Sequence, residues 1–216
     1  MLPAFLGKPG APIAILCLGA HCDDIEIGAG GTVLRLLAER PGSTVKWVVF
    51  ASTPEREAEA RASAAEVLAA AGKAEVEVNR FRESYFPFLG DQIKDHFERI
   101  KAAIRPDLVL THATIDLHQD HRTIGELTWN TFRDHLIAEY EIPKYEGDLQ
   151  RPNLFVPLPR ATAQRKIDGI VRHFPSQAGR RWFRPETFEA LLRLRGVECN
   201  APDGFAEAFH VRKIVV

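Results

Sequence analysis

Residues 11–26 read APIAILCLGAHCDDIE, an apolar run that passes directly into a histidine and two aspartates. The part from Ala11 to Leu18 is rich in Ile and Leu and has no alternating polar positions, which is typical of a strand buried on both faces. Such a strand belongs to a parallel sheet covered by helices. The polar residues that follow it are therefore expected at the carboxyl edge of the sheet, where α/β proteins bind ligands.

The strand-helix unit repeats along the chain, and the pattern predicts an α/β fold: a Rossmann-like, doubly wound, mostly parallel sheet with helices on both faces. We expect a single domain over residues 1–216, with 139–152 as a long loop. The expected strands are 11–18, 44–52, 74–81, 108–110, 153–158 and 206–216. The expected helices run from Gly30 or Thr32 to Arg40, from Thr53-Pro54 to Gly72, and over 91–104, 162–173 and 185–194.

Composition excludes several classes of protein. The 28 basic and 29 acidic residues give a net charge of −1, which provides no field to attract nucleic acid. Three cysteines are too few for a disulfide framework or a cysteine-rich zinc site, so we expect a cytoplasmic protein. The apolar run near the N-terminus is short and ends in polar residues, and we expect neither a secretion signal nor a membrane span.

A second polar cluster, Asp116, His118, Asp120 and His121, follows the apolar run 108–110. Because both clusters follow buried strands, we expect them at the same edge of the sheet. Histidine and carboxylate side chains are the ligands of catalytic zinc, which takes three protein ligands and leaves one position open. The sequence therefore predicts a metal site where the two clusters meet.

The spacing indicates which residues bind the metal. His21 and Asp24 are three residues apart at a strand-to-helix turn, so both can point at one ion while Asp23 projects elsewhere and is free to act as a base. His121 is expected at the start of a helix through Ile124, where a fixed backbone can aim its ring at the same edge. We predict His121 as the third ligand.

At this level of detail the sequence resembles the PIG-L (LmbE-like) zinc N-deacetylases. Residues 21–26, HCDDIE, with Gly28 and the Gly30-Gly31-Thr32 that follow, resemble the first signature of that family. Residues 118–121, HQDH, match the second. Residues 56–68 resemble the family's helix after the second strand and 206–209 its closing strand, so the resemblance covers nearly the whole chain.

The resemblance implies one zinc ion per chain on His21, Asp24 and His121, with Asp23 as the general base. These assignments agree with the roles inferred from spacing. The implied reaction is hydrolysis of an acetamide on an N-acetylated sugar of the N-acetylglucosamine type. The implied partner is a small glycoconjugate, and homo-oligomers are frequent in the family.

The resemblance also implies that His118 is the acid or oxyanion-stabilising group, that Asp120 holds its ring, and that Arg56 contacts the substrate. Each has a plainer interpretation. Asp120 can cap the helix that follows it, and Arg56 can be a solvated partner of Glu59 on a surface helix.

One departure from the family pattern is Cys22, at a position where proline is usual. Cys22 is either a soft competitor for zinc or a small buried filler. Gly28, Gly30 and Gly31 do not form a dinucleotide fingerprint and are expected to let a helix pack closely on the sheet.

His112 and Asp116 are either groups that orient the ligands or plain loop residues. The loop 139–152, with Lys144 and Tyr145, is where we expect the substrate to be selected. Two other functions use the same residues: a non-haem iron oxygenase with a two-histidine, one-carboxylate site, and a catalytically silent sugar- or nucleotide-binding protein. The iron site is usually built on an all-β frame, and silent binding needs neither Asp23 nor His118.

Overall fold

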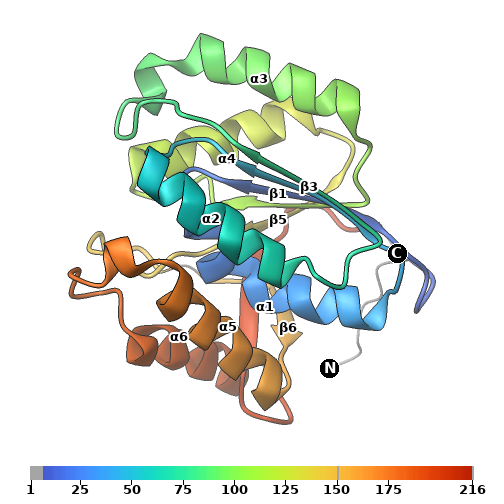
Figure 1. Ribbon diagram of the computed structural model, residues 1–216. Coiled ribbons are helices and arrows are strands. Elements are labelled where there is room, and N and C mark those ends of the chain that lie inside the picture. Colours follow the sequence, from blue (N-terminus) through green and yellow to red (C-terminus); the bar gives the residue numbers. More distant parts are fainter. Residues whose placement is uncertain (1–6, 150, 216) are drawn as a thin grey trace.

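The computed structural model describes residues 7–149 and 151–215, and its centre is a seven-stranded sheet in the order β3-β2-β1-β4-β5-β7-β6 (Figure 1). Strands β3, β2, β1, β4 and β5 are parallel, whereas β7 runs antiparallel to both β5 and β6. The strands are β1 (Ala14–Gly19), β2 (Thr44–Val49), β3 (Lys73–Val78), β4 (Leu108–His112), β5 (Leu136–Tyr140), β6 (Leu154–Pro157) and β7 (Ala206–His210). The predicted doubly wound α/β fold is confirmed.

Helices cover both faces of the sheet, as Figure 1 shows. One core joins α1, α2, α5 and α6 to one face, and a second joins α3 and α4 to the other. The helices are α1 (Asp24–Glu39), α2 (Pro54–Val67), α3 (Gly90–Ala103), α4 (Gln119–Thr131), α5 (Arg160–His173) and α6 (Pro185–Glu198), with single 3-10 turns at Phe86–Phe88 and Pro175–Gln177. Residues of β1 alternate between the cores: Ile15 and Cys17 face one, Leu16 and Leu18 the other.

The order of the strands creates a switch point between β1 and β4. From β1 the chain crosses to β2 and β3 on one side, and from β4 it continues to β5 on the other. At such a point the loops leaving neighbouring strands diverge and open a crevice beyond their carboxyl ends. Both polar clusters found in the sequence follow these two strands.

Two sequence predictions about local structure are wrong. Helix α1 begins at Asp24 rather than at Gly30 or Thr32. Residues 24–31 contain three glycines, which lower the helix propensity of the segment. The segment is buried throughout, and its packing compensates for this low propensity. Glu139 and Tyr140, expected in a loop, belong to β5. The charged residue Glu139 interrupts the apolar pattern that would predict a strand. In the structure this buried carboxylate pairs with Arg212 at 2.8 Å.

Other boundaries differ by a few residues. Helix α2 ends at Val67 and not at Gly72, β3 ends at Val78 and not at residue 81, and β7 ends at His210. Val216, the last residue of the expected strand 206–216, lies outside the described residues, as do Gln150 of the expected loop and residues 1–6 of the expected domain.

Helix α1 is held tightly against its neighbours. The Tyr140 hydroxyl donates a hydrogen bond of 2.7 Å to the carbonyl of Leu18, and its ring lies directly against Gly28. On the next turn the Glu207 carboxylate accepts hydrogen bonds from the backbone of Gly31 and Thr32. The glycines thus allow close packing of the helix that carries Asp24.

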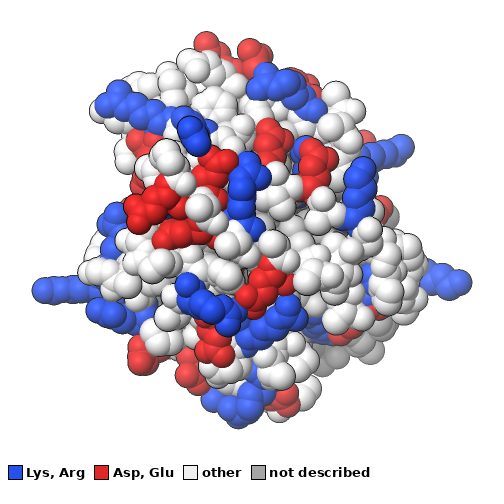
Figure 2. Space-filling model, viewed as in Figure 1, with Lys and Arg blue, Asp and Glu red and all other residues white. Residues whose placement is uncertain are grey.

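Surface charge follows the balanced composition. On the face shown in Figure 2, basic and acidic side chains are interspersed, and this face carries no continuous basic area of the kind that binds nucleic acid. Within residues 7–149 and 151–215, none of the helices has the length and apolar character needed to cross a membrane.

The packing of Gly28 gives a test of this arrangement. A Cβ at position 28 would lie 2.2 Å from Cδ2 of Tyr140, whereas one at position 30 would have its nearest neighbour at 3.8 Å. We expect Gly28→Ala to lower the free energy of unfolding by about 1–3 kcal/mol through overpacking. Gly30→Ala, the matched control, should leave it unchanged or raise it by about 0.5–1 kcal/mol, because alanine is the better helix former. Urea denaturation followed by circular dichroism measures both, and equal effects would contradict this account.

Candidate metal centre

The two polar clusters meet at the carboxyl ends of β1 and β4. His21 and Asp23 occupy the turn after β1, and Asp24 is the first residue of α1. His118 caps α4, which places His121 in the first turn of that helix. The fold thus brings together every predicted ligand, as expected from the position of the clusters after buried strands.

The three predicted ligands have the mutual distances that zinc requires. Nδ1 of His21 lies 3.2 Å from Nε2 of His121 and 3.3 Å from Oδ2 of Asp24, and Nε2 of His121 lies 3.5 Å from Oδ1 of Asp24. Ligands at 2.0–2.1 Å from a tetrahedral zinc ion are about 3.4 Å apart. The contact to His21 is made by one oxygen of Asp24 and the contact to His121 by the other, so these three side chains lie close enough together to share one ion.

Two further histidines lie within reach of the same position. Ligand atoms of His21, His118 and His121 all lie within 4.8 Å of one another, and so do those of Asp24, His112 and His121. Cys22 is in neither group: its buried thiol lies 3.4 Å from the carbonyl of Ala51 and points toward the core. The geometry favours the filler interpretation of Cys22.

Burial and mutual charge set the protonation of the ligands. Burial lowers the pKa of His121 to about 3, with the neighbouring His112 adding to the effect, so His121 is neutral. Burial works against an ionised Asp24, but the three surrounding imidazoles hold its pKa well below the usual range. Burial likewise opposes a charge on His21, yet Asp24 and Asp120 raise the pKa of His21 to about 10. In the protein without an ion, His21 thus carries a proton that a metal has to displace.

A second layer of groups orients the ligands. Oδ2 of Asp116 lies 3.1 Å from Nδ1 of His121, and its Oδ1 accepts a hydrogen bond from the backbone of His118. Nζ of Lys144 reaches the same carboxylate at 3.1 Å. Burial raises the pKa of Asp116, but the hydrogen bond from His121, together with the nearby His112 and Lys144, holds it well below its usual range. A carboxylate behind a histidine fixes the ring and its tautomer, so Asp116 is more than a loop residue.

His112 supports the other side of the cluster. It is fully buried at the end of β4, and its Nε2 lies 3.0 Å from Oδ2 of Asp24. The backbone nitrogen of Ala20 lies 3.0 Å from the same ring nitrogen, which accepts from Ala20 when unprotonated and donates to Asp24 when protonated. His112 therefore ties the carboxylate of α1 to the turn after β1.

Asp23 points away from the ligand cluster toward α2, as predicted. Its Oδ1 accepts a hydrogen bond of 2.9 Å from Nη2 of Arg56. Nη1 of the same guanidinium lies 3.3 Å from Oε2 of Glu83. Burial and the adjacent Asp24 raise the pKa of Asp23, while Arg56 counteracts both effects. A buried carboxylate of raised pKa is suited to accept a proton. Arg56 is thus part of the site rather than the surface partner of Glu59.

The contacts of Asp120 differ from those expected. Its carboxylate does not bond to the His118 ring but lies 3.3 Å from Nε2 of His21 and accepts hydrogen bonds from the backbone of Ser84 and Phe86. The Asp120 backbone N–H instead donates to Nδ1 of His118. When His118 is neutral, its proton therefore resides on Nε2. Burial lowers the pKa of His118, and the charge of His21 lowers it further.

Sequence reasoning missed the loop after β3. Glu83 binds Arg56, and Ser84 and Phe86 bind Asp120 through their backbone N–H groups. The loop has no histidine or aspartate to draw notice. The position of this loop could still have been inferred from the predicted parallel sheet. Strand β3 is parallel to β1, so its carboxyl end lies at the same edge of the sheet.

The sequence was compared with known families and structures. The PIG-L family model, described as GlcNAc-PI de-N-acetylase, matches residues 16–132, more than half of the chain. This chain belongs to the PIG-L family. A search of curated proteins found no match.

Solved structures share the fold across almost the whole length. They include an N,N'-diacetylchitobiose deacetylase from Pyrococcus horikoshii (TM-score 0.71, 19% identity, 95% of this chain and 84% of that chain) and the zinc-inhibited form of a teicoplanin deacetylase (0.71, 15%, 92% and 97%). A 4-carboxy-2-hydroxymuconate hydratase from Pseudomonas putida is also similar (0.69, 18%, 94% and 98%). At these identities the likeness is one of fold.

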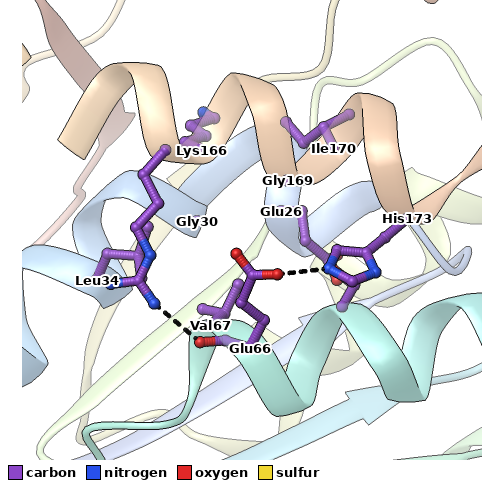
Figure 3. Close-up of a pocket in the computed structure, with 11 residues that line it drawn as sticks. Glu26, Gly30, Leu34, Glu66, Val67, Lys166, Gly169, Ile170 and His173 are labelled. Atoms are coloured by element: carbon purple, nitrogen blue, oxygen red, sulfur yellow. Dashed lines mark hydrogen bonds and ion pairs between the residues drawn. The ribbon is translucent and has the colours of Figure 1, made fainter. Parts of the chain in front are cut away.

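Away from the ligand cluster, this PIG-L protein has a hollow between α1, α2 and α5, where Glu66 and His173 bond to each other at 2.7 Å (Figure 3). Glu26 contributes a buried carboxylate from α1 to this hollow, which Ser63 of α2 also lines. Burial raises the pKa of Glu26 from 4.5 to about 8. The folded protein therefore holds this carboxyl group protonated at neutral pH.

The raised pKa of Glu26 predicts how stability depends on pH. Between pH 4.5 and about 8 the folded state binds a proton that the unfolded state has released, so stability falls as pH rises through this window. Glu26→Gln cannot ionise and should lose this decline, with a gain on the order of a few kcal/mol at pH 8.5 and little at pH 5. Urea titrations at both values measure the difference, with Glu55→Gln at an exposed position as the control. A variant that is equally affected at both values would contradict a buried, protonated Glu26.

Proposed function

We propose that this protein is a zinc-dependent N-deacetylase that removes the acetyl group of an N-acetylglucosamine-type sugar. The observation that carries the proposal is the set of 3.2, 3.3 and 3.5 Å distances among the ligand atoms of His21, Asp24 and His121. Membership of a family described as a de-N-acetylase supports the same reaction. The zinc-inhibited form of one similar deacetylase is consistent with a metal site in this fold.

His21, Asp24 and His121 would hold the ion, which when bound would polarise the amide carbonyl and make water more acidic. Asp23 then takes the proton from the attacking water. Its burial favours proton uptake, and the bond from Arg56 fixes the direction in which its free oxygen points. Once protonated, Asp23 can pass that proton to the leaving amine.

His118 is assigned a different role, at the carbonyl oxygen of the amide. Since its Nδ1 accepts a bond from the backbone, its Nε2–H is available as a donor. A neutral donor aimed at the carbonyl oxygen stabilises the negative charge that develops there. Asp120 contributes indirectly by holding the ring of His21 and the loop that begins after β3.

The alternative functions make different demands on these residues. An iron oxygenase would use the same three ligands but has no task for Asp23, and metal analysis distinguishes it. A silent sugar- or nucleotide-binding protein would need neither Asp23 nor His118. The similar hydratase shows that this fold also supports other chemistry, so activity has to be assigned by experiment.

The first test measures metal content and acetate release together. Wild-type protein should contain about one zinc ion per chain and release acetate from N-acetylglucosamine glycosides. Removing the metal by dialysis against a chelator should abolish release, and added zinc should restore it. Asp23→Asn should retain zinc and lose about 10²–10⁴-fold in kcat, because only proton transfer is removed.

Each outcome identifies the part of the proposal that fails. Iron in place of zinc would favour the oxygenase. Full acetate release by Asp23→Asn would exclude its role as the base. Zinc without acetate release from any N-acetylated sugar would leave the site intact and overturn the substrate class.

The role of His118 is tested separately with His118→Phe, which keeps an aromatic ring but removes the donor. We expect unchanged zinc content and a loss of about 10²–10³-fold in kcat, as for removal of one oxyanion donor. KM should change much less than kcat, because the lost bond forms in the transition state. Undiminished turnover in this variant would show that His118 has no such function.

A further inference from the structure

A buried ion pair lies against helix α1, beginning one turn after the predicted metal ligand Asp24. It joins Lys166 of α5 to Glu207 of β7, whose side chains are 4% and 2% exposed. Figure 3 shows Lys166 next to Gly30 of α1. Glu207 lies in residues 206–209, the segment that resembles the closing strand of the family. Neither charged residue has a part in the chemistry proposed above.

The ion pair bonds to both members of one helical step. In a regular helix each N–H donates to the carbonyl four residues earlier, which would join Gly31 to Ile27. Here Nζ of Lys166 donates a bond of 2.6 Å to the carbonyl of Ile27. Oε1 of Glu207 accepts a bond of 2.8 Å from the N–H of Gly31, and Oε2 accepts one of 2.6 Å from Thr32. Charged groups from two other elements thus fix this step of α1.

The contact at Ile27 reaches the predicted ligands through a single turn of helix. The N–H of Ile27 donates to the carbonyl of Asp23 at 3.1 Å, so the residue that Lys166 binds also closes the turn that contains Asp24. The side chain of Asp23 makes no capping bond to this turn and bonds to Arg56 instead. Without a side-chain cap, the turn depends on contacts further along α1.

Stability alone gives little reason for two charges at this place. Burial of an ion pair removes hydration that the attraction between the charges only offsets, and apolar side chains of similar size are often equally stable or more stable. Apolar side chains cannot bond to Ile27 or Gly31, however. With them, these two backbone groups could pair only with each other, as in a regular helix.

We propose that Lys166 and Glu207 are positioning residues for the metal site, which act through α1 to hold Asp24 at its distance from His21 and His121. This inference rests on the proposed function, since it requires that the site takes zinc. Metal ligands have to lie within about 0.2 Å of their coordination distances, so a small shift of the first turn weakens binding. Neither Lys166 nor Glu207 belongs to the groups that could themselves hold the ion.

The test separates metal binding from stability. In Lys166→Met/Glu207→Met, flexible apolar side chains replace both charges and fill the space. The free energy of unfolding of the metal-free variant, from urea denaturation, should equal or exceed that of the wild type. Its zinc dissociation constant, from competition with a chromophoric chelator, should rise by about 10–100-fold, as when a group that orients a ligand is lost.

Arg35→Met/Glu39→Met is the matched control. Arg35 and Glu39 form an ion pair of 2.7 Å on the same helix, but their side chains are 31% and 52% exposed. The control removes the same charges from α1 without touching the step between Ile27 and Gly31. Its zinc dissociation constant should equal that of the wild type.

Lys166→Met alone is the second variant, for the case that the double variant does not fold. In it the Glu207 carboxylate keeps both backbone donors, whereas the carbonyl of Ile27 loses its partner. Its zinc dissociation constant should rise by a smaller factor of about 3–10.

The outcomes distinguish this inference from the proposed function. Wild-type zinc affinity in the folded double variant, or in Lys166→Met, would overturn the positioning role and leave the proposed function standing. A wild type that binds no zinc would overturn both. Zinc affinity that depends on the ion pair, without acetate release from any N-acetylated sugar, would support the positioning role and contradict the proposed substrate.

Discussion

Parallel pairing of β1 with β4, in which Leu16 lies opposite Val109 and Cys17 opposite Leu110, brings segments 93 residues apart to one edge of the sheet. The two strands are buried on both faces, so their register is fixed by packing on each side. Every contact at the centre depends on that register. A different neighbour for β1 would leave His21 and Asp24 without His121, and neither cluster alone has three ligands at suitable spacing.

Bringing these groups together has an electrostatic consequence. Three imidazoles and several carboxylates are buried close together, and burial opposes every unpaired charge. The protein resolves this by separating the pKa values: Asp24 and Asp116 are held ionised, His121 is held neutral, and Asp23 is shifted toward protonation. A divergence of this kind among neighbouring groups is characteristic of acid-base catalysis.

The fold itself does not identify the reaction, since a hydratase and two deacetylases share it at 15–19% identity. What separates the possible activities is local. The ligand distances and the Asp23–Arg56 pair bear on the chemistry. The loops after β3 and β5 are joined to the centre through Asp120 and Asp116, so they share the contacts that position the predicted ligands.

The sequence determined the α/β class, the parallel strands and the two clusters, because apolar runs and the polar residues directly after them are local features. It also predicted His21, Asp24 and His121 as a ligand set, since the spacing of His21 and Asp24 and the placement of His121 on a helix require only local geometry. Tertiary structure decided the rest. Packing made a helix of the glycine-rich residues 24–31, and pairing with Arg212 allowed the charged Glu139 to lie in β5. Contacts between distant loops pair Asp120 with His21 rather than with His118, and they pair Lys144 with Asp116. These partners depend on how the loops pack against one another, which no local sequence pattern encodes.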